Sequence, residues 1–473
     1  MDEHLIQDSN SIGEILRQVY DEAAGFFEGL NDRPAGVPPT EYKIASLPET
    51  GLGSARTLAE FRDRYAGEIP GSVGPRYFGF VTGGVTPAAL AGDWLTSVFD
   101  QNATGHPFAA SAIERETISF LRELFNLTEA HSGAFVSGAT MANFVGLALA
   151  RQWVGQQMGV NVAQQGLSAL PPLKIFSGAP HSCIYKCLSM LGIGRDAMHL
   201  IPCLPDRQSV NIAALREALC LRGDRPSIVV ANAGEVNTVD FDDLAGIAAL
   251  KREFNFWLHV DAAFGGFAAC SPKYRHLTEG LDLADSIAID AHKWMNVPYD
   301  SAMQFTRHRQ LQLEIFWNNA AYLGSPSEIP EYHHLTPESS RRLRALAAWF
   351  SLMAYGRKGY QEIVERTCEM AQLLGSKIAA SDQFRLLAPV RMNVVCFTLA
   401  WPQEFSADTI KRFLAILSDN GKAVLTPTVY HGVPGMRAAV SNWRTTRQDI
   451  EVSWEALQEA AGELRRRVAE STL

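Results

Sequence analysis

The chain has 473 residues, of which 47% are hydrophobic, so it can build a large core and it exceeds the usual size of one domain. Its net charge is −9, from 42 basic and 51 acidic side chains, and no long run of Lys or Arg occurs, so nucleic acid is not an expected partner. The first residues lack the order of a signal peptide, and no window reaches about 18 uninterrupted apolar residues. We therefore expect a soluble, cytoplasmic protein with no membrane partner.

The cysteines give no sign of a metal centre. Seven cysteines are scattered through segments that otherwise look like core, which favours reduced, buried thiols. His181, Cys183 and Cys187 lie close together in the sequence, but no second ligand pair of similar spacing follows. We expect no metal site.

The N-terminal part of the chain predicts a helical arm. Between Ser11 and Leu30, apolar residues recur at the period of an amphipathic helix. A region from Gly67 to Pro87 that contains several Gly and Pro residues ends this arm. We assign residues 1–85 to an N-terminal segment.

The middle of the chain alternates between strand-like and helical segments. The expected strands lie in GAFVSGAT, PLKIFSG, PSIVVANAG, FWLHVDAA and DSIAIDAHKW, and the expected helices in MANFVGLALARQWV, HSCIYKCLSMLGI and around Leu244 to Phe254. Apolar, β-branched runs separated by helices predict an α/β fold with a mainly parallel sheet covered on both faces. We assign residues 86–345 to this large domain.

The C-terminal part predicts a smaller α+β domain over residues 346–473. A long amphipathic helix begins near Arg341 and runs through RRLRALAAWFSLMAYGRKGYQEIVERTCEMAQLLGSKIA. Mixed strands and helices follow, with strands expected in NVVCFTLAW, AVLTPTV and RAAVSNW.

Polar residues at the ends of the expected strands are the candidates for a binding site, because ligands of open α/β sheets collect at the carboxyl ends of the strands. The first such stretch is Ser137-Gly138-Ala139-Thr140, directly before a helix. A glycine turn and a helix N-terminus suit a phosphate, although Thr140 could also simply cap the helix.

Two further strand ends carry an acid and a base. Asp261 lies in WLHVDAAFGG, where an anion is costly to bury without a cationic partner. Lys293 ends the next expected strand, between His292 and Trp294, where desolvation would lower its pKa and leave a nucleophilic amine. A surface position is the commoner case for a lysine, and a structural ion pair for an isolated Asp. A phosphate cup, a buried Asp and a nucleophilic Lys together fit pyridoxal 5′-phosphate.

The stretches HVDAAFGG and DSIAIDAHKW resemble the group II pyridoxal-phosphate decarboxylases, the fold type I family of aromatic-L-amino-acid, glutamate and related decarboxylases. The resemblance extends from PRYFGFVTGGVTPAALAGDWL to VSNWRTTRQDIEVSWEAL. It implies a mainly parallel seven-stranded sheet in the large domain, pyridoxal phosphate as cofactor, an amino acid as the small-molecule substrate, and a homodimer with active sites at its interface.

The resemblance also implies roles for single residues around the cofactor ring. Lys293 matches the lysine that binds the cofactor as a Schiff base, and Asp261 matches the aspartate that pairs with the pyridine nitrogen. Ala263 corresponds to the small residue against one ring face. His181 resembles the histidine that stacks on the other face.

Further positions match the phosphate and carboxylate contacts of the family. Ala139, Thr140 and His292 fall at phosphate-contacting positions, and Thr238 lies in a loop that approaches the cofactor and the substrate carboxylate. This loop departs from the family pattern, since relatives read AGT or LGTT where Glu235 follows Ala-Gly here. A Glu235 facing the pocket would repel an acidic substrate or attract a basic one, whereas a solvent-facing Glu235 would have no effect.

The segment from Tyr322 to Arg342 resembles the mobile catalytic loop that closes over the active site of the neighbouring subunit. Counted back from Arg341-Arg342, Tyr332 takes the place of the tyrosine that protonates the carbanionic intermediate. It could also be an ordinary loop aromatic. The family's aldehyde-forming members tend to carry phenylalanine at this position, which favours a decarboxylase role.

The substrate is predicted from an aromatic-rich stretch near the start of the large domain. Tyr77, Phe78 and Phe80 match an aromatic-rich stretch that lines the substrate pocket in aromatic decarboxylases, although they could also be core residues. Thr82 is a further candidate for a substrate contact, but the stretch Val81-Thr82-Gly83 differs from the animal enzymes. Arg76 is a candidate contact for an acidic substrate. We hypothesise a decarboxylase of an aromatic L-amino acid; the alternatives are a decarboxylase of glutamate, aspartate or 2,4-diaminobutyrate, an aromatic aldehyde synthase, and a non-catalytic pyridoxal-phosphate-binding protein.

Overall fold

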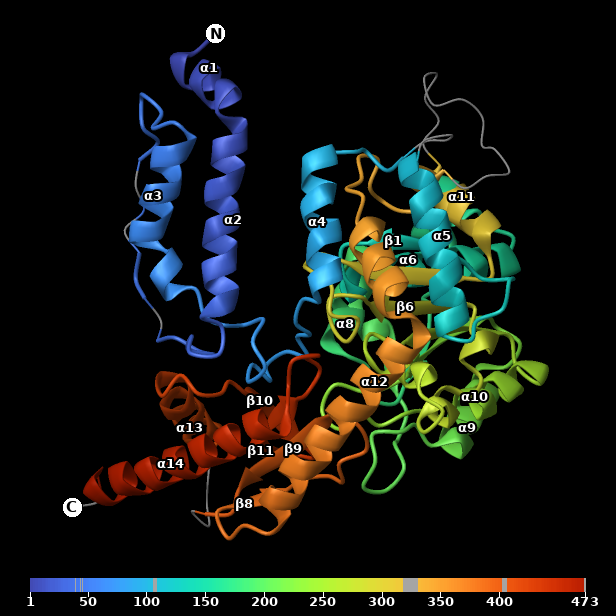
Figure 1. The fold of residues 1–473 in the computed structure, drawn as a ribbon. Coiled ribbons are helices and arrows are strands. Elements are labelled where there is room, and N and C mark those ends of the chain that lie inside the picture. Colours follow the sequence, from blue (N-terminus) through green and yellow to red (C-terminus); the bar gives the residue numbers. More distant parts are fainter. Residues whose placement is uncertain are drawn as a thin grey trace.

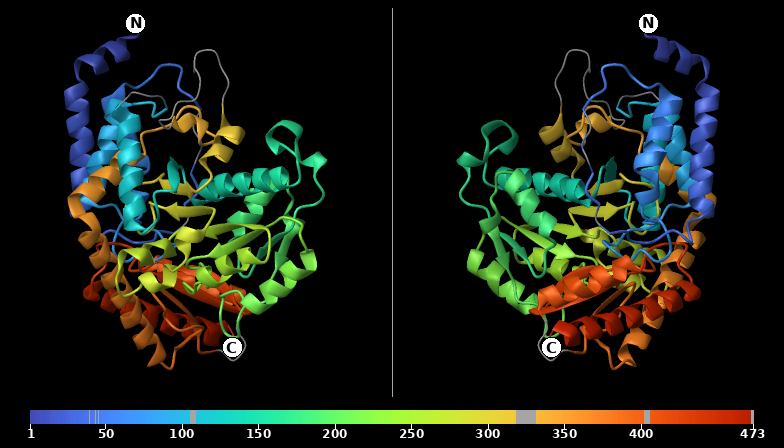
Figure 2. Two further views of the ribbon diagram at one scale, coloured as in Figure 1. Left: turned by 90° about the vertical axis from the view of Figure 1, so that its right-hand side faces the viewer. Right: turned by 90° about the vertical axis from the view of Figure 1, so that its left-hand side faces the viewer.

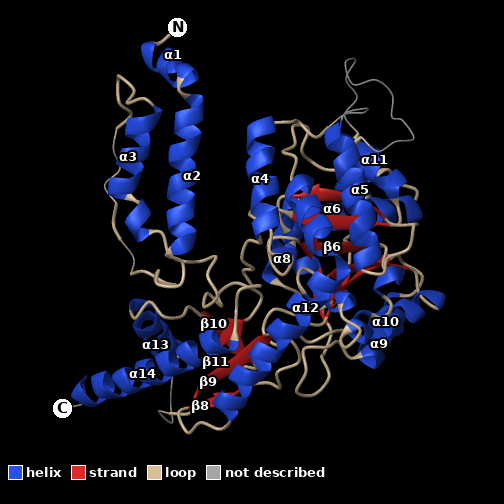
Figure 3. Cartoon of the chain, in the orientation of Figure 1, coloured by secondary structure: helices blue, strands red, loops and turns tan. Residues whose placement is uncertain are grey.

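The computed structural model describes residues 1–38, 40–42, 44, 46–104, 109–317, 331–401 and 406–471. It shows a large α/β body, a smaller α+β body below it, and a helical arm beside them (Figure 1). The strands lie in two separate groups, one in each body (Figure 3).

The large body is built on a seven-stranded sheet with the order β1-β7-β6-β5-β4-β2-β3. Its strands are β1 (Ser132–Val136), β2 (Ile175–Ser177), β3 (Met198–Leu200), β4 (Ser227–Asn232), β5 (Phe256–Asp261), β6 (Ser286–Asp290) and β7 (Ala302–Thr306). Strands β3, β2, β4, β5 and β6 are mutually parallel, and only β7 runs antiparallel to its neighbours β6 and β1. The predicted mainly parallel, seven-stranded sheet is therefore confirmed.

Helices cover both faces of this sheet, as the apolar strands predict. Adjacent residues of β4 point to opposite faces, so Val229 joins one core cluster and Val230 joins another. The first cluster packs against α5 (Ala109–Leu124), α9 (Ile212–Arg222), α10 (Leu244–Ala249) and the N-terminal part of α12 (Ala345–Ala379). The second packs against α6 (Ala139–Gln157), α8 (Ser182–Met190) and α11 (Arg309–Phe316). The short α7 (Val162–Gln165) follows α6.

The smaller body holds an antiparallel four-stranded sheet with the order β10-β11-β9-β8. Its elements are β8 (Phe384–Leu386), β9 (Val394–Leu399), α13 (Ala407–Asp419), β10 (Thr426–Tyr430), β11 (Val433–Ala439) and α14 (Arg447–Ser471). The predicted long helix is confirmed as α12, which runs from the large body down to the small one and breaks its helical backbone at Gly356 (Figure 1). The expected α+β character of the C-terminal part is therefore found, while the boundary at residue 346 stays a proposal.

The helical arm consists of α1 (Glu3–Asn10), α2 (Ile12–Glu28) and α3 (Ser54–Arg64). The predicted amphipathic helix between Ser11 and Leu30 is confirmed as α2. The structure describes all residues of these three helices, and none of them is buried. Helix α4 (Pro87–Phe99) leads from the arm into the large body and packs along α12. Figure 2 shows the arm on the outside of the molecule, with the small body at the opposite end from the N-terminus. Among the described residues, no helix has the length and apolarity needed to span a bilayer.

Candidate active site

A cavity of about 610 Å³ opens at the carboxyl ends of the parallel strands. Its wall combines residues at or after the ends of β1, β2, β3, β4, β5 and β6 with two residues from the loop before α4 and one from β11. The predicted site residues in this wall are Phe80, Ala139, Thr140, His181, Asp261, Ala263, His292 and Lys293. The topology therefore brings together most of the residues that the sequence singled out.

Lys293 lies in the connection that returns the chain from β6 to the antiparallel β7. Its Nζ atom is 3.0 Å from Oδ2 of Asp290, the last residue of β6. Burial on its own lowers the pKa of a lysine, but the carboxylates of Asp290 and Asp261 outweigh this effect and raise the pKa of Lys293. The expected low pKa is therefore wrong for the free amine, because that expectation considered burial alone and left out Asp290, three residues before Lys293.

Asp261 is the last residue of β5 and is 6% exposed. Its Oδ2 atom accepts a hydrogen bond of 3.1 Å from Asn143 of α6, whose own carbonyl oxygen lies 2.8 Å from Nε2 of His259. Nδ1 of His259 in turn lies 2.8 Å from the Ser286 hydroxyl. A buried chain of polar groups therefore fixes one side of the Asp261 carboxylate and leaves this acid facing the cavity.

The N-terminus of α6 lies beside this pair. Its N-cap residue is Gly138, without a capping side chain, so the alternative that Thr140 caps the helix is wrong. The amide of Ala139 donates a 2.6 Å hydrogen bond to Oδ1 of Asp290, and Nε2 of His292 lies 3.5 Å from the same oxygen. Two of the three positions predicted to contact phosphate, Ala139 and His292, thus lie at the Asp290 carboxylate, and the third, Thr140, lines the same cavity.

The two residues predicted to flank the cofactor ring also line the cavity. His181 is the N-cap of α8, where its Nδ1 atom accepts a 3.2 Å hydrogen bond from the amide of Cys183. Ala263 is 8% exposed, and its amide donates to Oδ1 of Asp261 at 3.2 Å. Both stay predictions as ring contacts.

Glu235 is buried in the wall of the cavity. It is 5% exposed, and its carboxylate accepts hydrogen bonds from the amide of Asn237 at 2.8 Å and from the hydroxyl of Thr238 at 2.5 Å. Burial raises the pKa of this carboxyl group. Glu235 therefore stabilises its own loop through these hydrogen bonds. Thr238 is 1% exposed and does not line the cavity.

Arg437 of β11 is a cavity residue that the sequence analysis missed. One guanidinium nitrogen donates a 2.6 Å hydrogen bond to the carbonyl of Val236, and Nε is buried without a hydrogen-bond partner among the described residues. Burial lowers the pKa of Arg437, and the charge of Glu235 opposes this effect. A guanidinium stays charged in any case, so the cavity has a cation besides Lys293.

Several predicted substrate residues do not line the cavity. Tyr77 lies outside its wall, and Thr82 is 9% exposed with its hydroxyl 3.3 Å from that of Tyr299. Arg76, the candidate contact for an acidic substrate, instead pairs with Asp449 at 3.3 Å. That interpretation of Arg76 is wrong, because its guanidinium is used within the small body.

Tyr332 also lies outside this cavity. It begins the short 3-10 helix η8 (Tyr332–His334), is 2% exposed, and packs against Ala134 and Leu335. The guanidinium of Arg341 lies 5.2 Å from the centre of its ring. The first part of the predicted catalytic loop, residues 322–330, lies outside the described residues, so its closure stays a prediction.

Comparison with known proteins identifies the family of the chain. The model of the pyridoxal-dependent decarboxylase conserved domain matches residues 46–400, more than half of the chain. The aromatic-L-amino-acid decarboxylase of Rattus norvegicus is 27% identical over 487 residues, which cover 97% of this chain and 99% of the relative.

Two solved structures show the same fold. The structure of Oryza sativa TDC with PLP and tryptamine has a TM-score of 0.87 at 23% identity and covers 96% of this chain and 98% of that chain. The glutamate decarboxylase domain of diaminobutyrate-pyruvate transaminase and L-2,4-diaminobutyrate decarboxylase from Vibrio parahaemolyticus has a TM-score of 0.84 at 21% identity and covers 96% of each chain. The chain therefore belongs to the pyridoxal-dependent decarboxylase family, and it is a pyridoxal-phosphate-dependent amino acid decarboxylase.

Proposed function

We propose that the substrate is an aromatic L-amino acid, which the enzyme converts to the corresponding amine and carbon dioxide. The observation that carries this proposal is the position of Phe80 in the cavity wall, on a backbone that few residues adopt. Phe80 and Val81 have φ angles of 56° and 57°, in the left-handed region that costs free energy for residues with a side chain. Phe264 adds a second aromatic ring to the same wall. The rat relative is named for aromatic amino acids.

The residues of the cavity fit pyridoxal phosphate. A lysine and a buried, hydrogen-bonded aspartate face one space, and the N-terminus of a helix lies beside them. When bound, the cofactor supplies an electron sink for the bond that breaks as carbon dioxide leaves. Lys293 would hold its aldehyde, and Asp261 would keep its ring nitrogen protonated.

Arg437 is the cavity group best suited to a substrate carboxylate. Its guanidinium lines the wall and keeps a buried Nε–H without a partner among the described residues. A carboxylate is the usual partner of such a fork of donors. We infer that Arg437 orients the amino acid through a charged hydrogen bond.

An acid must return a proton to the substrate carbon after carbon dioxide leaves. Tyr332 cannot do this in the cavity of its own chain, because it is buried outside the cavity wall. A tyrosine from a second chain would supply it if the segment around Tyr332 reached the neighbouring cavity. This role therefore goes with the proposed homodimer.

The proposal is tested by amine formation from a panel of amino acids with the cofactor-loaded enzyme. We expect tyramine, phenethylamine, tryptamine or a hydroxylated relative to form with stoichiometric carbon dioxide. Aldehyde and peroxide are measured in the same samples, because their appearance would identify an aldehyde synthase. Turnover of acidic or diamino substrates alone would contradict the aromatic proposal.

Arg437 also favours a second candidate, a decarboxylase of an acidic amino acid, since the cation could bind a distal carboxylate instead. The substitution Arg437→Gln separates the two. If Arg437 binds the carboxylate that all amino acids share, kcat/KM falls at least tenfold for every substrate. If it binds a distal carboxylate, only acidic substrates lose activity. Arg391→Gln is the matched control, because Arg391 pairs with Asp240 and does not line the cavity.

A further inference from the structure

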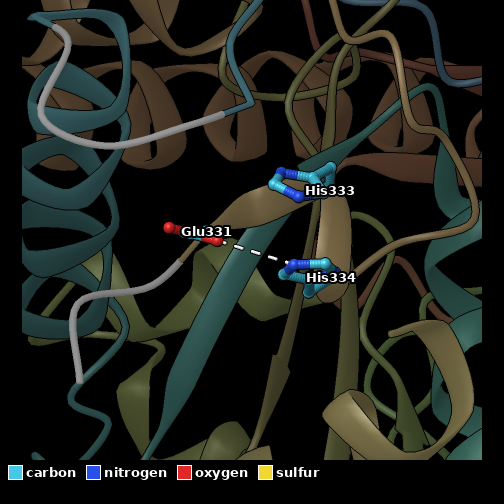
Figure 4. A group of neighbouring side chains, drawn as sticks. All are labelled: Glu331, His333 and His334. Carbon is cyan, nitrogen blue, oxygen red and sulfur yellow. Dashed lines mark ion pairs between the residues drawn. The ribbon is translucent and has the colours of Figure 1, made fainter. Parts of the chain in front are cut away.

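A second group of ligand-type side chains surrounds Tyr332, outside the pyridoxal phosphate cavity. Glu331, His333 and His334 each offer one atom suited to binding a metal, and these atoms all lie within 4.8 Å of one another. Figure 4 shows the three side chains gathered at the short helix η8. None of them lines the cavity that contains Lys293.

The two histidines of this group are deeply buried. His333 is 4% exposed and His334 is 0% exposed, and their ring centres are 3.9 Å apart. Nε2 of His334 lies 3.5 Å from Oε2 of Glu331, a long contact for a charge pair (Figure 4). Two imidazoles and a carboxylate are therefore held together with little access to water.

The hydrogen bonding of His333 determines which nitrogen is free. Its Nδ1 atom is 3.2 Å from the carbonyl oxygen of Thr104, and a carbonyl can only accept, so Nδ1 carries the hydrogen. Nε2 then presents a lone pair, and it is buried without a hydrogen-bond partner among the described residues. Leaving such a buried atom without a partner is unfavourable. A backbone carbonyl on the far nitrogen is also the arrangement typical of metal-binding histidines.

The donor set identifies the class of metal. Calcium and magnesium prefer oxygen ligands, whereas two imidazoles and a carboxylate suit zinc and similar divalent transition metals. Around a tetrahedral zinc with bonds of about 2.0–2.1 Å, neighbouring ligand atoms are about 3.4 Å apart. The present spacing of up to 4.8 Å is therefore at most about 1.4 Å wider than the spacing around a bound zinc.

We propose that Glu331, His333 and His334 bind one divalent transition-metal cation of the zinc class. This site departs from the sequence expectation of no metal, which considered only the residues from His181 to Cys187. Tyr332 stands between the first two ligands, so a bound cation holds this segment with the tyrosine ring buried.

The site is tested by titrating the metal-free, cofactor-loaded full chain with zinc in a calorimeter and with cobalt in a spectrophotometer. We expect one cation per chain, with the visible bands of tetrahedral cobalt. His333→Ala and Glu331→Gln should each weaken binding at least tenfold. His431→Asn is the matched control, because His431 is exposed and distant in sequence from the site, and it should bind the cation as wild type does.

A melting experiment covers the case in which His333→Ala folds poorly. Zinc should raise the Tm of the wild type and of His431→Asn, and it should leave that of Glu331→Gln unchanged. The proposal is overturned if the wild type binds no cation, or if the Glu331 and His333 variants bind it as tightly as the wild type. No substrate is present in either measurement, so the result is independent of the proposed substrate.

Discussion

The carboxylate of Asp261 is held by Asn143, a neighbour that does not line the cavity. Asn143 donates its amide hydrogen to Asp261 and accepts at its oxygen from the His259 ring. Because a carboxylate is stabilised in its charged form by donors, this hydrogen bond keeps Asp261 ready to pair with a protonated ring nitrogen. Asn143 is thus a positioning residue in the proposed site.

Replacing Asn143 by Ala should lower kcat about 10- to 100-fold, the range found when residues that orient the ligands of a metal site are removed. The absorption spectrum of the bound cofactor should change in the same variant, because the ring nitrogen would share its proton differently. Both are measured on purified, cofactor-loaded protein.

The matched control for Asn143 is Gln152→Ala, in the same helix. Gln152 is fully buried and hydrogen-bonded, but it lies at the other end of α6 and faces Asn161 and Glu314. It should lower stability and leave kcat and the spectrum unchanged. Equal effects of the two variants on the spectrum would contradict the positioning role of Asn143.

The sequence predicted those site residues that stand at the ends of strands. Lys293 and Asp261 follow apolar runs, so their meeting at one sheet edge followed from the expected parallel order. Arg437 comes from the small sheet and reaches the cavity only through the packing of two bodies, which no local pattern encodes. Asn143 could have been found from the sequence, since it is a lone amide within the apolar helix MANFVGLALA, where a buried polar side chain needs a partner.

At the scale of elements, the loop between the arm and α4 is hydrogen-bonded to the connection that carries Lys293. The amide of Gly84 donates to Oδ1 of Asn296 at 2.9 Å, and the amide of Thr86 donates to the Asn296 carbonyl at 2.9 Å. A Cβ atom on Gly83 would collide with the carbonyl oxygen of Lys293. The close approach of these two backbones is therefore possible only with glycine at position 83.

Gly83→Ala should consequently displace Lys293 or the loop that bears Phe80. We expect weaker retention of pyridoxal phosphate, a lower Tm, and loss of at least 90% of decarboxylation, because the two segments cannot both keep their places. Cofactor content after gel filtration and the melting temperature measure these effects.

Gly462→Ala provides the control for the same chemical change. Gly462 lies within α14, and a Cβ atom there meets nothing within 4 Å. Alanine also favours a helix over glycine by up to about 1 kcal/mol, so this variant should be as stable as the wild type or more so. A Gly83→Ala protein with normal cofactor content would show that the loop adjusts without affecting Lys293.

Most strands and helices of the large body could be predicted, but the position of β7 could not. The stretch AMQFT is short and buried, and it inserts between β6 and β1 with the opposite direction. Such an insertion follows from the tight return of the chain after Lys293, which periodicity does not reveal. The end of one helix also differs from the prediction, since α10 ends at Ala249 and a 3-10 turn continues only to Arg252, whereas the helix is expected to reach Phe254.

At the scale of the whole molecule, the helical arm exposes apolar side chains that no other part of the described chain covers. Helix α2 exposes an apolar stripe made of Ile12, Leu16 and Tyr20, spaced four residues apart. Residues with this spacing share one side of a helix, and an apolar stripe in water is unfavourable by about 25 cal/mol per Å². A second copy of the chain would cover the stripe, which agrees with the homodimer expected from the family resemblance.

We predict that the enzyme sediments as a dimer and that the double substitution Ile12→Glu and Leu16→Glu raises the dimer dissociation constant at least tenfold. Charges on this stripe would have to be buried without partners at the interface, which is costly. Arg17→Glu is the control in the same helix, since it introduces the same side chain and removes only an exposed ion pair with Glu14, which contributes little. Sedimentation velocity over a range of protein concentrations gives the dimer dissociation constants of the wild type, the double variant and Arg17→Glu.

A wild type that sediments as single chains, or a double variant that associates as tightly as the wild type, would mean that α2 does not form the interface. The requirement that Tyr332 act in a neighbouring cavity would then lose its structural basis.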